Sequence, residues 1–178
     1  MKKITVVANN IESLGQSVND DLVRLGNQVT LTSQFDQTLK TAQVVVWLAE
    51  NPRVDDQVFD LIGLLDQRAK APEKIVMLSI AGVNDEVDTK KLSSWYGDEY
   101  GDLILSYQYA IKMIDELEIP YTIVRAAPQT NASTSVKVSN EGSPLQGDLV
   151  NVDSLATIIA NACSIDQYTN QSIGVSDI

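Results

Sequence analysis

Short apolar runs alternate along the chain with longer stretches in which apolar residues recur at helical spacing. The runs are rich in β-branched residues and too short for most helices, which is typical of strands buried in a sheet. They lie at 4–8, 28–32, 42–48, 74–79 and 120–125. The longer stretches predict amphipathic helices at 13–25, 55–69, 103–117 and 150–162. This alternation predicts a three-layer α/β domain, in which helices cover both faces of a mostly parallel sheet.

Two regions interrupt the pattern. Residues 80–102 combine glycines with Trp95 and Tyr96, and we expect a long irregular loop there, at the end of a strand where α/β folds place substrate contacts. Residues 126–147 are rich in Ser, Thr, Asn and Gly, with a short strand expected at 135–138. Asn51-Pro52 is expected to break the chain after the third run, and 172–176 to form a final edge strand.

The composition favours a single domain that spans residues 1–178. With 44% hydrophobic residues the chain can bury a sizeable core, and it has no apolar run long enough for a membrane span. The absence of His excludes Ser-His-Asp triads, and no residue spacing suggests a metal site. A net charge of −11 without a basic cluster argues against nucleic-acid binding. The single cysteine, Cys163, excludes an intrachain disulfide and, without a secretory leader, predicts a cytoplasmic protein.

The first strand leads into the loop where an α/β nucleotide-binding fold would hold a pyrophosphate on a helix N-terminus. We expect the helix to begin at Ser13, with Gln16 completing a capping box. A G-x-x-G-x-x-G loop needs glycine at positions 9, 12 and 15, and the chain has Asn9, Glu12 and Gly15. The predicted site therefore keeps the architecture of a dinucleotide cradle with altered chemistry.

Four segments resemble a known family: VVVWLA at 44–49, VMLSIAG at 76–82, IPYTIVRAAP at 119–128 and GDLVNVDSLA at 147–156. On these segments the chain resembles the atypical short-chain dehydrogenase/reductases of the NmrA-like group, which are NAD(P)-binding Rossmann proteins that include NADH–flavin reductase-like members. The resemblance covers nearly the whole chain and implies a Rossmann-like fold with NAD(P) as the cofactor. It implies cofactor contacts from the first loop, two strand ends and one helix: Asn9, Asn10, Ile11, Glu12, Ser13, Leu14, Ser33, Ala49 and Lys112.

The chain departs from this family in the cradle and in the sheet. β-branched Ile11 and the Glu12 carboxylate oppose the approach of a phosphate, so one interpretation is a turn that has lost its cofactor role. In the other, Asn9 and Asn10 tolerate left-handed geometry and the helix still offers its N–H groups to a phosphate. NAD(P) is therefore expected as a cofactor whose binding is weak or lost. No Arg or acidic selector directly follows the second strand, where Ser33 offers only a weak hydrogen bond to a ribose or 2′-phosphate or belongs to a plain loop. The connection at 33–41 is too short for the usual βα unit, so we expect the sheet to lack its usual third strand.

The wider superfamily uses Tyr-x-x-x-Lys on a helix, where the lysine holds the ribose and the tyrosine transfers a proton. Here Gln108 stands four residues before Lys112, while Tyr109 stands three residues before it on the same helical face. With Ser79 at the preceding strand end, the candidate catalytic residues are Ser79, Tyr109 and Lys112. The alternative is that Tyr109 and Lys112 are ordinary half-exposed helix residues and that Ser79 satisfies a strand end.

The candidate substrate pocket has two interpretations. Trp95 and Tyr96 either form the wall of a site for a flat ring or pack the long loop against the domain. Arg125 either orients a ligand or pairs with a carboxylate such as Glu50. Pro128, at the end of the third resembling segment, completes this candidate pocket.

Two functional hypotheses follow from these residues. The first is an NAD(P)H-dependent oxidoreductase acting on a small flat acceptor of the flavin or quinone kind, with hydride chemistry from the cofactor. The alternative is a non-catalytic Rossmann protein that has lost dinucleotide binding and acts as a redox or ligand sensor or as an interaction module. The altered cradle favours the second hypothesis and the family resemblance favours the first. The expected partners are a small-molecule ligand and a second copy of the chain, with neither nucleic acid nor a membrane.

Overall fold

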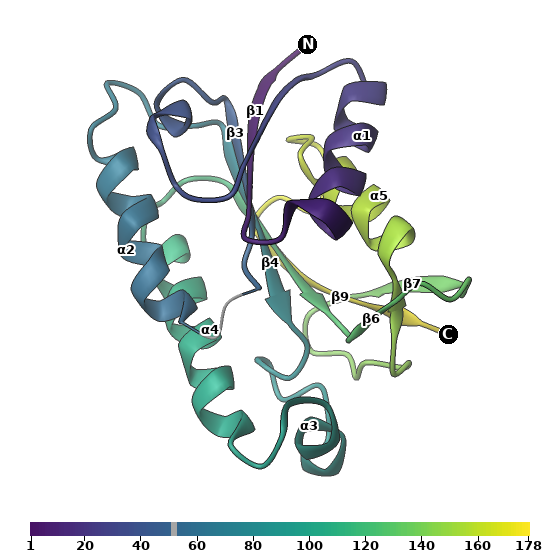
Figure 1. The fold of residues 1–178 in the computed structure, drawn as a ribbon. Coiled ribbons are helices and arrows are strands. Elements are labelled where there is room, and N and C mark those ends of the chain that lie inside the picture. The colour runs from purple at the N-terminus through teal and green to yellow at the C-terminus, as the bar shows by residue number, and fades with distance from the viewer. Residues whose placement is uncertain (51–52) are drawn as a thin grey trace.

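A computed structural model describes residues 1–50 and 53–178, and the break predicted at Asn51-Pro52 lies outside these ranges. A seven-stranded sheet in the order β2-β1-β3-β4-β5-β9-β7 lies between two helical layers (Figure 1). Its strands are β1 (Lys3–Ala8), β2 (Gln28–Thr32), β3 (Val44–Leu48), β4 (Lys74–Ile80), β5 (Tyr121–Ala126), β7 (Val136–Ser139) and β9 (Gln171–Asp177). A separate two-stranded sheet pairs β6 (Gln129–Thr130) with β8 (Val150–Asn151). All neighbours in the main sheet are parallel except the pair of β7 with β9.

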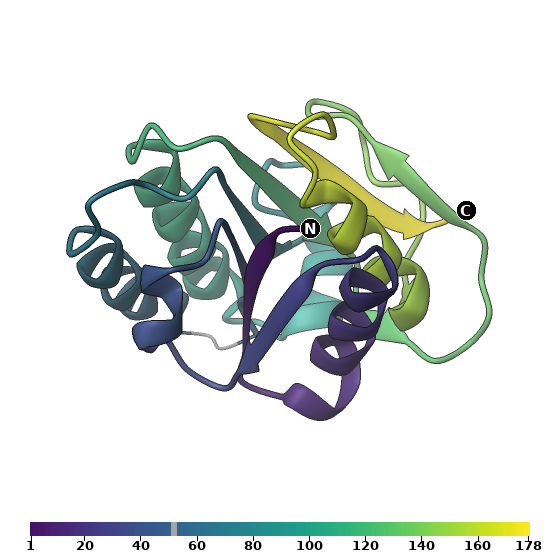
Figure 2. The same ribbon diagram turned by 90° about the horizontal axis from the view of Figure 1, so that it is seen from above.

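Helices cover both faces of the sheet, as the alternating pattern predicts. They are α1 (Gln16–Arg24), α2 (Val54–Leu65), α3 (Thr89–Tyr96), α4 (Tyr100–Asp115) and α5 (Val152–Ala162), with two short turns η1 (Ile11–Gly15) and η2 (Gln37–Lys40). Helices α1 and α5 cover one face, and α2 and α4 cover the other (Figure 2). Because both faces are covered, every residue of β3 is buried, which explains why its sequence is apolar without alternation.

The sheet ends at β2, which pairs only with β1 among the described strands. The chain then returns to β3 through η2, a single turn whose first N–H groups are capped by Asp36. This confirms the prediction that the usual third strand is missing. Of the described helices, none is both long and apolar enough to cross a membrane.

Three details of the predicted elements are wrong. The first helix does not begin at Ser13, whose backbone is non-helical at φ −113° and ψ −108°; Asn10 caps the turn η1, and α1 begins only at Gln16. The stretch at 80–102 is not a continuous irregular loop, because Asp88 caps α3 within it. The last strand is not at the edge, because β9 lies between β5 and β7.

The parallel strands β1, β3, β4, β5 and β9 all end at the same edge of the sheet, which is the lower edge in Figure 1. The loop after β1 and the loop after β4 both lie at this C-terminal edge, with α3 beneath it. The fold therefore brings together the two segments that the sequence singles out for function. The opposite, N-terminal edge holds the start of β1 and the chain that follows α5.

Candidate functional site

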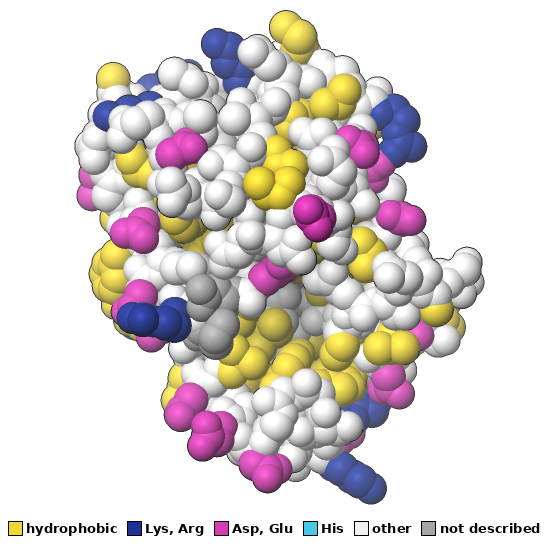
Figure 3. Space-filling model, in the orientation of Figure 1, with side chains coloured by type: hydrophobic (Ala, Val, Ile, Leu, Met, Phe, Trp, Pro, Cys, Tyr) yellow, Lys and Arg dark blue, Asp and Glu magenta, His cyan; other side chains and the backbone are white. Residues whose placement is uncertain are grey.

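A pocket of about 230 Å³ opens at the C-terminal edge of the sheet, and we call it the sheet-edge pocket. The ends of β3, β4 and β5 form its floor, and aromatic residues of α3 and α4 form its walls. The residues that matter for its chemistry are Ala49, Glu50, Ser79, Trp95, Tyr96, Tyr107 and Pro128. Figure 3 shows hydrophobic side chains gathered in a hollow at this end of the molecule, with acidic side chains around it. Five predicted site residues from four segments therefore line one pocket: Ala49, Ser79, Trp95, Tyr96 and Pro128.

Ser79 is the polar group that the protein leaves unsatisfied in this pocket. It lies near the end of β4, paired in register with Arg125 of β5, and is only 1% exposed. Its Oγ has no hydrogen-bond partner within the described part of the chain. Buried hydroxyls are nearly always hydrogen-bonded, because leaving one unpaired costs about 1–3 kcal/mol. The interpretation that Ser79 satisfies a strand end is therefore not supported, and its hydroxyl is buried and unpaired in a residue that lines the pocket.

Two tyrosines give the pocket its shape. The Tyr96 hydroxyl donates a hydrogen bond of 2.9 Å to the Ala81 carbonyl, and the Tyr107 hydroxyl donates to the Ala49 carbonyl. Burial raises the pKa of both phenols well above the ordinary value for tyrosine. Both therefore stay protonated at neutral pH and act as fixed donors to the backbone. Trp95 contacts the Tyr96 ring edge-on, so the aromatic wall is a packed unit.

Glu50 is a functional candidate that the sequence pattern identified only as a possible ion-pair partner. It directly follows Ala49 at the end of β3 and lines the sheet-edge pocket. Partial burial raises the pKa of its carboxyl above the ordinary value for glutamate. A carboxyl with a raised pKa in a pocket is a candidate for proton transfer.

Arg125 does not pair with Glu50. Its guanidinium is fully buried and its Nη1 lies 2.9 Å from Oε1 of Glu86, while its Nε donates to Ser172 Oγ at 2.9 Å. Glu86 in turn accepts hydrogen bonds from the backbone N–H groups of Gly82 and Asn84, at 2.8 and 2.9 Å. The pair thus fixes the loop between β4 and α3 against β5. Arg125 supports the pocket from behind and does not line it.

Tyr109 and Lys112 are not brought to Ser79. They line a separate groove on the outer face of α2 and α4, where the Tyr109 ring contacts Phe59 and the Lys112 side chain is 72% exposed. The residue of α4 that faces the pocket is Tyr107, two positions before Tyr109 and therefore on the opposite side of the helix. The predicted Ser79, Tyr109 and Lys112 set is therefore not assembled. The position of Lys112 also gives no support to its predicted cofactor contact.

The first loop has one of the three glycines of a G-x-x-G-x-x-G loop, Gly15, and it has Asn9 and Glu12 at the other two positions. A side chain at Gly15 would meet Ala8 Cβ at 3.1 Å and the Asn10 carbonyl at 3.2 Å, so this position needs glycine for the contact of helix and strand. Asn10 Oδ1 accepts a hydrogen bond of 3.1 Å from the Glu12 N–H, a backbone donor at the start of the turn. The Glu12 side chain is exposed. One donor is thus already capped, and a carboxylate lies beside the cradle.

The other predicted cofactor residues differ in accessibility. Asn9 and Ser13 are exposed and Ile11 is half-buried, whereas the Leu14 side chain is fully buried in the core and offers only its backbone. Ser33 is exposed after β2. The acidic residue nearest that strand end is Asp36, whose carboxylate accepts hydrogen bonds from Thr32 and Thr38. These hydrogen bonds, chiefly that of the Thr38 side chain, lower the pKa of the Asp36 carboxyl. Asp36 is thus held by its own loop.

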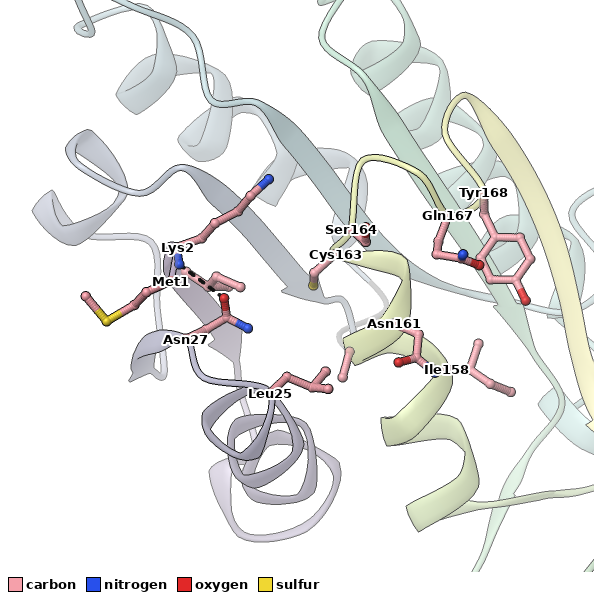
Figure 4. Close-up of a pocket in the computed structure, with 12 residues that line it drawn as sticks. Met1, Lys2, Leu25, Asn27, Ile158, Asn161, Cys163, Ser164, Gln167 and Tyr168 are labelled. Carbon is pink, nitrogen blue, oxygen red and sulfur yellow. Dashed lines mark hydrogen bonds between the residues drawn. The ribbon is translucent and has the colours of Figure 1, made fainter.

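A larger hollow, of about 640 Å³, lies at the N-terminal edge of the sheet (Figure 4). Its lining includes Lys2, Asn27, Cys163, Ser164 and Gln167. Behind it, the buried Lys74 Nζ donates to the carbonyls of Ser164 and Gln167, at 2.9 and 2.5 Å. Burial raises the pKa of the Cys163 thiol to about 12, so this thiol is unreactive at neutral pH. No sequence pattern pointed to this hollow.

Comparison with known proteins identifies what the chain is similar to. A family model described as NAD(P)H-binding matches residues 2–165. A short-chain dehydrogenase/reductase from Veillonella parvula, solved in complex with NADP, superposes with a TM-score of 0.77 at 17% identity, covering 99% of this chain and 94% of that one. The oxidoreductase ylbE from Lactococcus lactis gives 0.74 at 15% identity, over 99% and 91%. A Rossmann-fold NAD(P)-binding family protein from Shigella flexneri gives 0.72 at 16% identity, over 99% and 94%. No curated protein matches the sequence.

Proposed function

The chain belongs to the NAD(P)H-binding family of Rossmann domains, and from this premise we propose that it is an NAD(P)H-dependent reductase of a small flat acceptor. The acceptor would bind in the sheet-edge pocket, at the C-terminal edge where α/β folds bind their ligands. The observation that carries this proposal is the buried hydroxyl of Ser79, which has no partner in the described protein and belongs to a residue that lines this pocket. The narrower assignment to the NmrA-like group stays a prediction.

The described residues fit the nicotinamide ring of the cofactor better than they fit its phosphates. Ala49 and Pro128, at the margin of the pocket, would contact its ring, and the backbone around Asn9 and Ser13 would face its phosphates. The cap of Asn10 on the Glu12 N–H and the Glu12 carboxylate weaken the phosphate end. When bound, the cofactor supplies a hydride, and the chain must supply position and a proton.

Each polar residue of the pocket then has a role. The Ser79 hydroxyl donates a hydrogen bond to a carbonyl oxygen of the acceptor, because it has no competing partner in the described protein. Trp95 forms an apolar wall for the acceptor ring. The Glu50 carboxyl, with its raised pKa, donates the proton that accompanies reduction. Tyr96 and Tyr107 hold the wall through their backbone hydrogen bonds and transfer no proton.

A pocket of about 230 Å³ limits the acceptor. It suits one or two fused rings, such as a quinone or the reactive part of a flavin, and not a large extended substrate. The aromatic wall and the single open hydroxyl favour a flat ring that carries a carbonyl.

A second candidate function rests on the cradle. The capped Glu12 N–H, the exposed Glu12 carboxylate and the lack of an Arg after β2 favour a non-catalytic Rossmann protein that binds a small ligand in the same pocket without a dinucleotide. Such a protein would act as a sensor or interaction module. The two candidates share the pocket and differ in cofactor binding.

Titration with NADH and NADPH, followed by nicotinamide fluorescence and thermal shift, separates the two candidates. The reductase requires saturable binding with a Kd below about 1 mM. A Glu12→Gly variant is expected to bind at least about tenfold more tightly, a gain of about 1.4 kcal/mol, because it removes a carboxylate beside the phosphates. Binding of neither nucleotide to either protein would sink the reductase proposal and leave the second candidate. Glu12→Gln is the matched control, since it removes the charge and keeps the side chain.

A further inference from the structure

Strand β2 is the outermost strand on one side of the sheet, and its outer side is open. The Gln28 N–H donates to the Lys2 carbonyl at 2.9 Å, so alternate residues of β2, beginning with Gln28, turn their backbone groups toward β1. The residues between them, Val29 and Leu31, therefore turn their N–H and C=O groups outward. Within the described part of the chain, no hydrogen bond reaches these four groups. Such a row of unpaired backbone groups is where another strand can add to a sheet.

The two outermost strands of the sheet differ in their charge. On the opposite side β7 carries the exposed Lys137, and a lysine on an outermost strand opposes the addition of another strand. β2 has neither a charge nor a proline, and no charged residue stands between Arg24 and Asp36. Because the chain has a net charge of −11, a second copy meets least repulsion where it approaches an uncharged stretch of this kind.

The side of α1 that lies above this part of the sheet is also uncharged. Asp21 faces α5, because its carboxylate accepts a hydrogen bond of 2.8 Å from the Thr157 hydroxyl. Val23 stands two positions later, about 200° further around the helix, so its side chain points away from α5 and toward the side of β2. It is 53% exposed. Asn19, four positions before Val23, lies on the same side of the helix.

We propose that a second copy of this chain adds to β2, with the two β2 strands antiparallel around a two-fold axis at Thr30. In this register Val29 lies opposite the partner's Leu31, and Leu31 lies opposite the partner's Val29. Each of these pairs exchanges two N–H···O=C hydrogen bonds, so every outward backbone group of both strands is paired. A register centred on Val29 or on Leu31 would leave the other residue without a partner within β2. The free backbone groups thus favour one register.

The proposed register makes the two sheets continuous. Thr30 lies opposite the partner's Thr30 in a pair without direct backbone hydrogen bonds, where the Cα atoms are about 4.5 Å apart. Two threonines are a favourable cross-strand pair. The partner's β2 then takes the place beside β2 that is open because the usual third strand is missing. The contact is isologous, so it closes as a dimer and leaves neither β2 open.

This contact is independent of the sheet-edge pocket, because no residue of β2 lines that pocket. The tests of the contact need neither a cofactor nor an acceptor. Failure of the strand pairing would leave the reductase proposal untouched, and the reverse also holds.

Sedimentation equilibrium of the full chain at about 100 µM is the first test. Thr30→Lys is expected to halve the mass of the wild-type assembly, because like charges would face each other across the axis. Thr30 is exposed, so the variant should stay folded, which thermal unfolding checks. Gln171→Lys is the matched control and should keep the wild-type mass, since it adds the same charge at an exposed position of β9. A monomeric wild type, or a Thr30→Lys variant with the wild-type mass, would overturn the proposal.

A mixture of two variants tests the symmetry of the contact. Thr30→Glu should dissociate in the same way as Thr30→Lys, because two carboxylates would then face each other. An equimolar mixture of the two variants places a lysine opposite a glutamate and should bind at least about tenfold more tightly than either variant binds itself. A mixture that stays as dissociated as the separate variants would contradict a two-fold axis at Thr30.

Cysteine substitution locates the axis. With oxidised glutathione as the oxidant, Thr30→Cys should form a disulfide-linked dimer, because Cα atoms about 4.5 Å apart are within disulfide range. Gln28→Cys is the matched control, since four positions along the strand separate it from its equivalent by about 14 Å, which is too far for a disulfide. The native Cys163 is buried in both variants. Failure of Thr30→Cys to cross-link, or equal cross-linking of Gln28→Cys, would contradict the proposed register.

Discussion

The two edges of the sheet hold hollows of opposite character. The hollow at the N-terminal edge is the larger, at about 640 Å³ against 230 Å³ for the sheet-edge pocket. Yet the two lysine ammonium groups at this edge have partners in the protein: Lys2 pairs with Glu73 at 2.7 Å, and Lys74 binds two backbone carbonyls. At the C-terminal edge the protein leaves the buried Ser79 hydroxyl unsatisfied in a smaller space. The proposed site is therefore at the edge with the unpaired buried hydroxyl and not at the edge with the larger hollow.

The edges also differ in how they hold buried charge. Lys74 at the N-terminal edge is a buried cation with backbone partners only, whereas Arg125 near the C-terminal edge meets a buried carboxylate, Glu86. The first arrangement ties down the chain after α5. The second fixes the loop that leads into α3 and so the aromatic wall of the pocket. Loss of the first would therefore loosen only the chain after α5, whereas loss of the second would also change the shape of the pocket.

The largest expected effect is on the buried ion pair. Glu86→Ala should lower the free energy of unfolding by about 3–5 kcal/mol, because it leaves the Arg125 guanidinium buried without its carboxylate. Chemical denaturation measures this. Glu73→Ala is the control at the other edge, where the partly exposed pair with Lys2 should contribute no more than about 1 kcal/mol. If Glu86→Ala and Glu73→Ala lowered the free energy of unfolding equally, the buried ion pair would contribute no more to stability than the partly exposed one.

Lys74 should give a smaller and pH-dependent effect. Burial lowers its pKa from 10.5 to about 8 in the folded protein, so between these values the unfolded chain binds more protons and stability rises with pH. The penalty for burying the charged form is therefore fully present below pH 8 and is lost by pH 10.5, a change of about 3 kcal/mol. Lys74→Met removes this titration, so the stability of the wild type relative to the variant should rise across that range. A constant difference in denaturation midpoints would contradict the lowered pKa.

Ser79→Ala should have the smallest effect on stability and a clear effect on binding. The hydroxyl makes no hydrogen bond within the described protein, so its removal should change the free energy of unfolding by less than about 0.5 kcal/mol. If it bonds an acceptor carbonyl, the variant should bind quinones or flavins about tenfold more weakly. Calorimetric titration beside a denaturation curve gives both quantities. A destabilised variant with unchanged binding would show that Ser79 is structural.

The sequence predicts the frame of the molecule well because burial on both faces leaves a direct trace in composition. β3 is apolar throughout, so the central strands follow from the composition. The missing strand follows from the loop before β3, which is too short for the βα unit of the family that the chain resembles. The short strand β7 was expected, but its pairing with β9 was not, because a strand partner is a long-range contact. α3 was missed because its sequence is polar, with only Leu92 fully buried.

The site was predictable only where helical phase and strand ends determine it. Ser79 follows from the end of β4. The spacing to Lys112 predicts Tyr109 as its partner, but Tyr107 is the tyrosine on the apolar stripe that faces the sheet. The position of Tyr109 around the helix, two residues after Tyr107, already indicates that its side chain points away from the sheet. The partner of Arg125 was beyond prediction, because Glu86 reaches it from a loop 39 positions earlier in the chain. Contacts between a strand and a distant loop leave no periodic signal.

Hydrogen exchange of the protein with and without saturating NADPH tests the central claim most directly. The account predicts slower exchange at the C-terminal edge, in the loop at 9–15 and at the ends of β3, β4 and β5, with no change around 158–168 at the N-terminal hollow. Slower exchange confined to the N-terminal hollow would contradict the account. The absence of any change would also contradict it, if the NADPH concentration is well above the upper limit of about 1 mM set for the dissociation constant.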